Sequence, residues 1–114
     1  MPSRIEMATG EGALFKDIWE SLEPEERVSF ITGHTLADPY EMRAYYFAHC
    51  LGKGAYPEFR LYRKNIVLLN RNEHKLWDFG KDKIKANPHL MQLWQKMFEL
   101  EEELKIEYHE KSEY

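Results

Sequence analysis

Residues 66–80 read IVLLNRNEHKLWDFG, an apolar run followed at once by a segment with helix signals at both ends. The run Ile66–Leu69 has the length and composition of one buried β-strand. Asn70, with Glu73 three residues later, is the capping-box pattern of a helix start, and Gly80 is a typical residue for a helix end. This stretch therefore predicts a short strand that leads directly into a short helix.

The segment before this stretch supplies a partner strand. Tyr45–Cys50 is aromatic and strand-like, and Gly52-Lys53-Gly54 interrupts it. Residues 55–64 contain Pro57 and have the pattern of a loop or an irregular strand. The order across this half of the chain is therefore strand, loop, strand and capped helix. Its large aromatic residues are expected in the core rather than as base-stacking platforms, namely Tyr45, Tyr46 and Trp77.

The flanking segments predict further helices at both ends of the chain. The expected elements are, in order, a loose arm over the first ten residues, a helix over Ala13–Leu22, a helical turn at Pro24, a β-prone run Val28–Thr32 that turns at Gly33 and, after a basic connector, a C-terminal helix at about 88–109. With the central segment, these elements predict an α+β fold in a single domain over residues 1–114. Its core motif lies at about 30–80.

Length and composition exclude several classes of protein. The 114 residues are 43% hydrophobic and 14% aromatic, which suits one compact domain rather than a disordered tail. No apolar run approaches the roughly 18 residues of a membrane span, and the first residues lack the apolar segment of a secretory signal. Cys50 is the single cysteine, which excludes an intramolecular disulfide and a zinc ribbon. We therefore expect no membrane association and a cytoplasmic location.

Charge is unevenly distributed along the chain. The formal net charge is −4, but residues 43–85 hold ten Lys and Arg against four Asp and Glu, a net charge of +6. The remaining residues include six basic and 16 acidic ones, a net charge of −10. A basic middle within an acidic chain can present a face that attracts phosphate, although a surplus of solvated Lys and Arg explains the charge equally well.

Four polar residues of the central segment can meet at one site. His49 lies on the first expected strand, and Asn65 begins the second. Residues four apart share one helical face, so His74 and Asp78 can reach a common divalent cation, for which both offer suitable ligands. Taken singly, each residue also has an ordinary structural explanation: a hydrogen-bonded strand histidine, a turn asparagine and an exposed helical pair.

In this order and at this spacing, these residues resemble the motif of the HNH, or ββα-metal (His-Me finger), endonuclease superfamily. The matching segments are Ala48-His49, Lys64–Asn70 and Glu73–Asp78. The likeness covers about half of the chain, from Phe30 to Gly80. A weaker likeness, carried by Gly52-Lys53-Gly54 and Pro57–Arg60, is to small phage recombination-associated nucleases. The resemblance implies a ββα-metal hairpin-plus-helix motif to which the N- and C-terminal helices are additions.

The resemblance also implies a function and a role for each residue. The protein would be a metal-dependent endonuclease that hydrolyses DNA phosphodiester bonds in a bacterial or phage-infected cell. His49 would be the general base that activates water. Asn65 would brace the hairpin of the catalytic motif by hydrogen bonds, although in some branches of the family an Asn is itself a metal ligand. His74 and Asp78 would bind the divalent metal, with Mg²⁺ as the first choice and Mn²⁺, Ni²⁺ or Zn²⁺ as alternatives. The expected contacts to the DNA backbone lie in the loop between the strands and are Lys53, Arg60, Arg63 and Lys64.

Two departures from the family pattern keep other functions open. Many members carry a further metal ligand, Asp or His, immediately before the base, where this chain has Ala48. The cysteine pairs of a structural zinc site are missing, because Cys50 is alone. The first alternative is therefore a catalytically degenerate HNH-fold protein that binds DNA or acts as an adaptor. The second is a structural interaction module whose acidic C-terminal helix binds a partner, against which the net charge of +6 in the middle argues.

Overall fold

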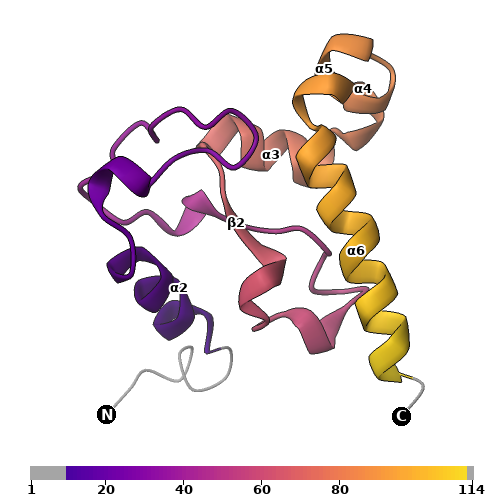
Figure 1. Ribbon diagram of the computed structural model, residues 1–114, viewed down its shortest axis with the longest axis horizontal. Helices are drawn as coiled ribbons and strands as arrows, with labels where there is room; N and C mark the ends of the chain where they lie inside the picture. The colour runs from indigo at the N-terminus through magenta and orange to yellow at the C-terminus, as the bar shows by residue number, and fades with distance from the viewer. Residues whose placement is uncertain (1–9, 113–114) are drawn as a thin grey trace.

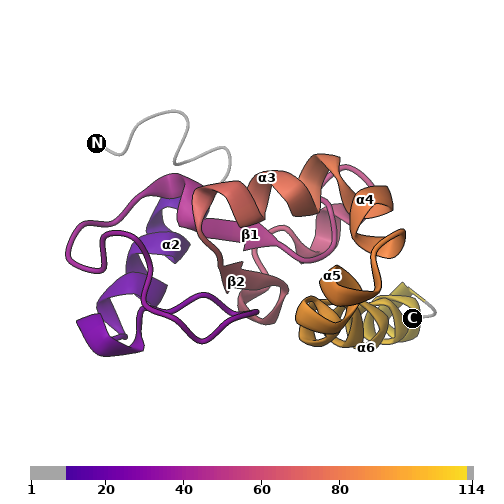
Figure 2. The ribbon, with the colours of Figure 1, turned by 90° about the horizontal axis from the view of Figure 1, so that it is seen from above.

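A two-stranded antiparallel sheet lies in the middle of the molecule, with helices on both sides (Figure 1, Figure 2). The structure is a computed structural model, and it describes residues 10–112. Strand β1 (Phe47–His49) pairs with strand β2 (Ile66–Leu68). The register places His49 opposite Ile66, so His49 ends the first strand beside the start of the second.

Five α-helices surround the sheet within residues 10–112. Their bounds are α2 Glu11–Glu20, α3 Arg71–Phe79, α4 Lys81–Lys85, α5 Pro88–Leu93 and α6 Gln95–Ser112. Short 3₁₀ turns lie between them at Pro24–Glu26, Ala44–Tyr46, Pro57–Phe59 and Arg63–Asn65. Helices α2 and α6 lie on opposite sides of the sheet in both views (Figure 1, Figure 2). The molecule is therefore a compact α+β domain, as the sequence predicts.

The two strands are buried on both faces, and each face packs into a different core. Because alternate side chains of a strand point to opposite sides, Ala48 and Val67 join a cluster with Trp77 of α3 and Met97 of α6. The other face packs on α2, with Phe47, Ile66 and Leu68 against Phe15, Ile18 and Trp19. Burial on both faces explains why residues 66–69 form an unbroken apolar run instead of an alternating one.

Helix α3 begins and ends where the sequence predicts. Asn70 and Glu73 form the capping box, in which the backbone N–H of Asn70 donates to Glu73 Oε1 at 2.8 Å. The helix ends before Gly80, where a Cβ atom would lie 2.6 Å from Leu76 Cδ1 and 3.1 Å from the Leu76 carbonyl oxygen. Glycine therefore permits the tight turn from α3 into α4. The indole of Trp77 is buried, which turns the opposite side of α3 outward.

The structure corrects two predictions in the C-terminal half. The basic connector after Gly80 forms helix α4, which Ile84 anchors in the core. The predicted C-terminal helix is two helices, α5 and α6, because the chain breaks at Trp94. The Trp94 ring stacks on that of Trp77 with centroids 5.6 Å apart, and this core contact fixes the break.

Three further expectations differ in detail. The first strand begins at Phe47, not at Tyr45. The prediction that Tyr45 lies in the core is wrong, because its side chain is 39% exposed, whereas Tyr46 and Trp77 are buried as predicted. The β-prone run from Val28 forms an isolated bridge to Thr35 across a turn rather than a strand. The predicted loose arm lies outside the described residues except for its last residue. None of the helices between residues 10 and 112 has the length and apolar character to cross a membrane.

Candidate active site

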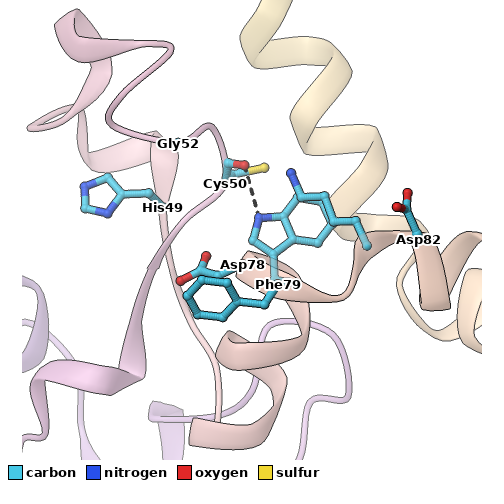
Figure 3. A pocket seen from close by; sticks show the side chains of 8 residues that line it. His49, Cys50, Gly52, Asp78, Phe79 and Asp82 are labelled. Atoms are coloured by element: carbon cyan, nitrogen blue, oxygen red, sulfur yellow. Dashed lines mark hydrogen bonds between the residues drawn. The ribbon is translucent and has the colours of Figure 1, made fainter.

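His49 lies at the end of β1 and lines a cleft between the hairpin, α2 and α3. The cleft has a volume of about 530 Å³, and its walls include Glu11 of α2 and the predicted metal ligands His74 and Asp78 of α3. An adjoining pocket of about 310 Å³ also has His49 and Asp78 in its wall (Figure 3). The structure thus brings the predicted base and the predicted metal ligands to one concave site.

One ring nitrogen of His49 is fixed by the loop between the strands. Nε2 lies 2.8 Å from the backbone carbonyl oxygen of Arg60. A carbonyl oxygen only accepts hydrogen bonds, so Nε2 carries the proton of the neutral ring and Nδ1 holds the lone pair. The neutral imidazole is therefore a base at Nδ1.

Burial lowers the pKa of His49 below its ordinary value of 6.5, because the cleft disfavours the charged imidazolium. The Arg60 carbonyl and the Glu11 carboxylate oppose this shift, whereas the electrostatic effects of Lys53 and His74 add to it. With only 10% of its side chain exposed, His49 is neutral at pH 7. A neutral ring is the state that a general base needs.

Asn65 holds the loop that carries Arg60. Its side chain is fully buried, and Oδ1 accepts the backbone N–H of Leu51 at 2.7 Å. Nδ2 donates to the carbonyl oxygens of Leu51 at 3.1 Å and Phe59 at 3.2 Å. These bonds join both ends of the loop, so the carbonyl of the next residue, Arg60, is held against His49. Being buried, Asn65 acts on the cleft through the loop and cannot touch a substrate.

His74 and Asp78 contact each other on α3 in a geometry that suits a cation. His74 Nδ1 lies 2.7 Å from the Tyr45 carbonyl oxygen, so Nδ1 carries a proton. Nε2 lies 3.1 Å from Asp78 Oδ2. With the proton of a neutral ring on Nδ1, the Nε2 lone pair faces a carboxylate oxygen, so the contact needs a proton shared by the two groups or a cation bound by both.

Spacing and surroundings allow a test of the metal hypothesis. Two adjacent ligands of an octahedral cation with bonds of about 2.1 Å lie about 3.0 Å apart, which matches the separation of His74 Nε2 and Asp78 Oδ2. Within residues 10–112, no group of three or more His, Cys, Asp and Glu side chains could hold a metal ion. The pair therefore fits an open site that water and phosphate oxygens complete.

Glu11 reaches the cleft from α2, and the sequence prediction missed it. Its side chain is 15% exposed, and Oε1 lies 3.8 Å from His49 Nε2 and 3.1 Å from Lys53 Nζ. Glu11 thereby holds Lys53, a predicted DNA contact, at the edge of the cleft. The sequence signal was too weak to find it, because an acidic residue in the first turn of a helix is common on electrostatic grounds alone.

The loop between the strands is tied to α2 and α6 by its basic residues. Arg63 Nη1 lies 2.9 Å from Asp17 Oδ2 of α2. Lys64 Nζ lies 2.7 Å from Glu103 Oε1 and also contacts Glu107, both on α6. Hydrogen bonds to Glu103 and Glu107 raise the pKa of Lys64, and the bond to Lys64 lowers the pKa of Glu107. The contact of this loop with DNA stays a prediction.

Comparison with known proteins adds no relative from which a function could be taken. No protein-family model, no curated protein and no solved structure matches this chain. The function is therefore inferred from the cleft and from the chemistry of the side chains that line it.

Proposed function

We propose that the protein is a metal-dependent endonuclease of the HNH, or ββα-metal, type, which hydrolyses phosphodiester bonds in DNA. The observation that carries this proposal is the placement of His49, with Nε2 bonded to a carbonyl oxygen, in one cleft with His74 and Asp78. A neutral base beside a pair of metal-ligating side chains is what this hydrolysis requires. The exposed Lys75 and Lys83, which have no carboxylate partner among the residues that the structure describes, support a polyanionic substrate.

In the proposed reaction, His49 Nδ1 takes a proton from a water molecule whose oxygen forms a bond to phosphorus. The bond between phosphorus and the leaving 3′-oxygen breaks, and that oxygen takes a proton from solvent. His74 and Asp78 would hold a divalent cation, Mg²⁺ first, whose charge offsets negative charge on the phosphate and on the leaving oxygen. The Arg60 carbonyl keeps His49 in the required tautomer, and Asn65 keeps that carbonyl in place.

Two observations favour a second candidate, a DNA-binding protein that keeps the HNH scaffold without turnover. Ala48 is fully buried within the hairpin and contributes no ligand. The contact between His74 and Asp78 is also satisfied by a doubly protonated imidazole, which needs no metal. We prefer the nuclease because a neutral, cleft-lining His49 has a direct use in hydrolysis, and the two candidates differ in a simple assay.

A plasmid-nicking assay tests the proposal. Wild-type protein should nick supercoiled DNA with Mg²⁺ or Mn²⁺ and not with chelator. His49→Ala should lower the rate by a factor of about 10² to 10⁴ and leave DNA binding intact, because the base contacts water rather than DNA. His34→Ala, which changes an exposed histidine outside the cleft, is the matched control and should cleave like wild type.

Equal cleavage by wild type and His49→Ala would overturn the mechanism. Absence of cleavage by wild type with Mg²⁺, Mn²⁺, Ni²⁺ and Zn²⁺, together with retained DNA binding, would favour the scaffold without turnover. If the wild-type protein neither cleaves nor binds DNA, both candidate functions are excluded.

A further inference from the structure

The outward side of α3 carries a row of residues beside His74 and Asp78. Arg71, Lys75 and Phe79 follow one another at intervals of four, and residues four apart are rotated by only about 40° around a helix axis. They therefore form one row along the helix, next to the row of His74 and Asp78. A nucleic-acid strand held at the cleft would have this row beside it.

Phe79 ends the row at the mouth of the cleft and is 85% exposed. It lines the cleft of His49 and the adjoining pocket that contains Asp78 (Figure 3). It also lines a third pocket, of about 280 Å³, on the other side. The turn at Gly80 leaves the ring at the corner between α3 and α4. A single exposed aromatic residue is ordinary by itself. Phe79 differs from such a residue by its position at the mouth of the cleft and by its neighbours.

Two lysines flank Phe79. Lys75 and Lys83 are exposed and line the third pocket with the phenyl ring. Among the residues that the structure describes, neither has an ion pair or a hydrogen bond through its side chain. This distinguishes them from Lys53, Arg63 and Lys64, whose charges are matched by carboxylates. The ammonium groups beside Phe79 are therefore available to phosphate.

We propose that Phe79 is a stacking platform for an unpaired base of single-stranded DNA whose flanking phosphates contact Lys75 and Lys83. The inference rests on the proposed nuclease function and adds the form of the substrate: DNA that is unpaired next to the bond that is cut. An aromatic ring can stack on any base, and lysines neutralise phosphates without reading sequence. In an intact duplex the base faces are already covered by their neighbours, so the ring has no base on which to stack.

The surroundings of Phe79 suit a nucleic acid better than an apolar protein partner. The third pocket is lined by Asn72, Lys75 and Lys83, with Leu76 as its other large apolar side chain. A protein interface of useful affinity needs a contiguous apolar patch, which one phenyl ring among charged side chains of both signs does not provide. An exposed ring with unpaired lysines on one side of it suits single-strand binding, which combines stacking with contacts to phosphate.

Fluorescence anisotropy in the presence of chelator tests the inference, with a labelled single strand and a blunt duplex of the same sequence. Phe79→Ala should weaken single-strand binding by about five- to 150-fold, the range for loss of one base–aromatic stack. Binding of the blunt duplex should change less than about twofold. Phe79→Trp should restore single-strand affinity. Tyr40→Ala is the matched control, because Tyr40 is 79% exposed but lies outside the cleft.

Quenching of tryptophan fluorescence in Phe79→Trp measures stacking of a base on residue 79 directly. The native tryptophans are at most 5% exposed, namely Trp19, Trp77 and Trp94. The new indole in Phe79→Trp is therefore the main accessible one, and added oligo(dT) should quench it while blunt duplex should not. Unchanged single-strand affinity in Phe79→Ala, or an equal loss on single strand and duplex, would overturn the inference.

The two proposals fail separately. Nicking that depends on His49, with wild-type single-strand binding by Phe79→Ala, would refute the platform and leave the nuclease. A selective loss of single-strand binding in Phe79→Ala, without cleavage by wild type under any metal, would support the platform on a scaffold without turnover.

Discussion

The loop between the strands and the outward face of α3 both carry basic residues, but they use them differently. In the loop, Arg63 and Lys64 pair with carboxylates of α2 and α6. On the α3–α4 face, Lys75 and Lys83 have no such partner among residues 10–112. The same residue types thus hold the fold together in one region and stay available to a ligand in the other. A count of charges along the sequence does not show which basic residues stabilise the fold and which are available to a ligand.

Asn65 and the proposed metal ligands also differ between these two regions. Asn65 is buried in the loop region and bonded to backbone on both sides. His74 and Asp78 lie on α3 at the wall of the open cleft. The comparison therefore predicts that loop substitutions lower stability first and that α3 substitutions lower binding or catalysis first.

The largest effect is expected for Asn65→Ala. The substitution leaves the Leu51 N–H and the carbonyl oxygens of Leu51 and Phe59 without their buried partner. Each such group costs about 1–3 kcal/mol, so urea unfolding should show a free energy of unfolding lower by at least about 3 kcal/mol. Asn72→Ala, on the exposed face of α3, should change it by less than about 0.5 kcal/mol. Equal effects of the two substitutions would erase the distinction between the regions.

His74→Ala probes the α3 region. Loss of a ligand should raise the Mn²⁺ concentration that gives half-maximal nicking by at least about tenfold, since removing even the partner of a ligand commonly costs 10- to 100-fold. Excess Mn²⁺ should restore part of the rate. His89→Ala, at an exposed position outside the cleft, is the control. A wild-type Mn²⁺ dependence combined with lowered stability would assign His74 to the fold instead.

Charge reversal in the two regions gives the direct comparison. Lys75→Glu should weaken DNA binding for all sequences and reduce the slope of log affinity against log salt by about one, because one phosphate contact is lost. Lys64→Glu should instead lower stability, since it places a third carboxylate beside Glu103 and Glu107. If the salt dependence of DNA affinity is flattened in Lys64→Glu and unchanged in Lys75→Glu, DNA binds at the loop between the strands, as the sequence predicts, and not at α3.

The hairpin and α3 could be predicted because their signals are local. The apolar run of β2, the capping box at Asn70 and the stop at Gly80 each depend on residues close together in the chain. The break at Trp94 could not be predicted, because two consecutive helices have the same apolar periodicity as one. It depends on the stack against Trp77, a tertiary contact.

In the candidate site, too, the residues with local sequence signals could be predicted and those that depend on tertiary contacts could not. The order and spacing of His49, His74 and Asp78 in the sequence indicate a common site, and all three line one cleft of the structure. Glu11 and the partners of Lys64 lie on terminal helices, and nothing in the sequence says which surface those helices cover. The sequence leaves open that the acidic end of α6 is a docking surface, yet part of that end pairs with Lys64 in the loop of the same chain.

The smallest expected effect is a shift in the titration of His49, which sits between the two regions. Burial lowers its pKa below 6.5, and the electrostatic effects of Lys53 and His74 add to this shift, whereas the Arg60 carbonyl and Glu11 oppose it. An NMR titration in chelator should therefore show the pKa of His49 below its ordinary value of 6.5. The unfolded chain binds more protons than the folded chain between the folded pKa and 6.5, so His49 adds stability above this window and loses it as the pH falls through it.

Two substitutions in the Glu11–Lys53 pair should move this titration in opposite directions. Lys53→Ala removes a positive charge and leaves the Glu11 carboxylate uncompensated near His49, so the His49 pKa should rise. Glu11→Gln removes the negative charge and should lower it. Because the acid limb of the nicking rate follows the fraction of neutral base, its midpoint should shift with the NMR value in both variants. Shifts in the same direction would mean that the pair acts on His49 through packing and not through charge, and an NMR shift without a shift of the rate profile would remove His49 from the role of base.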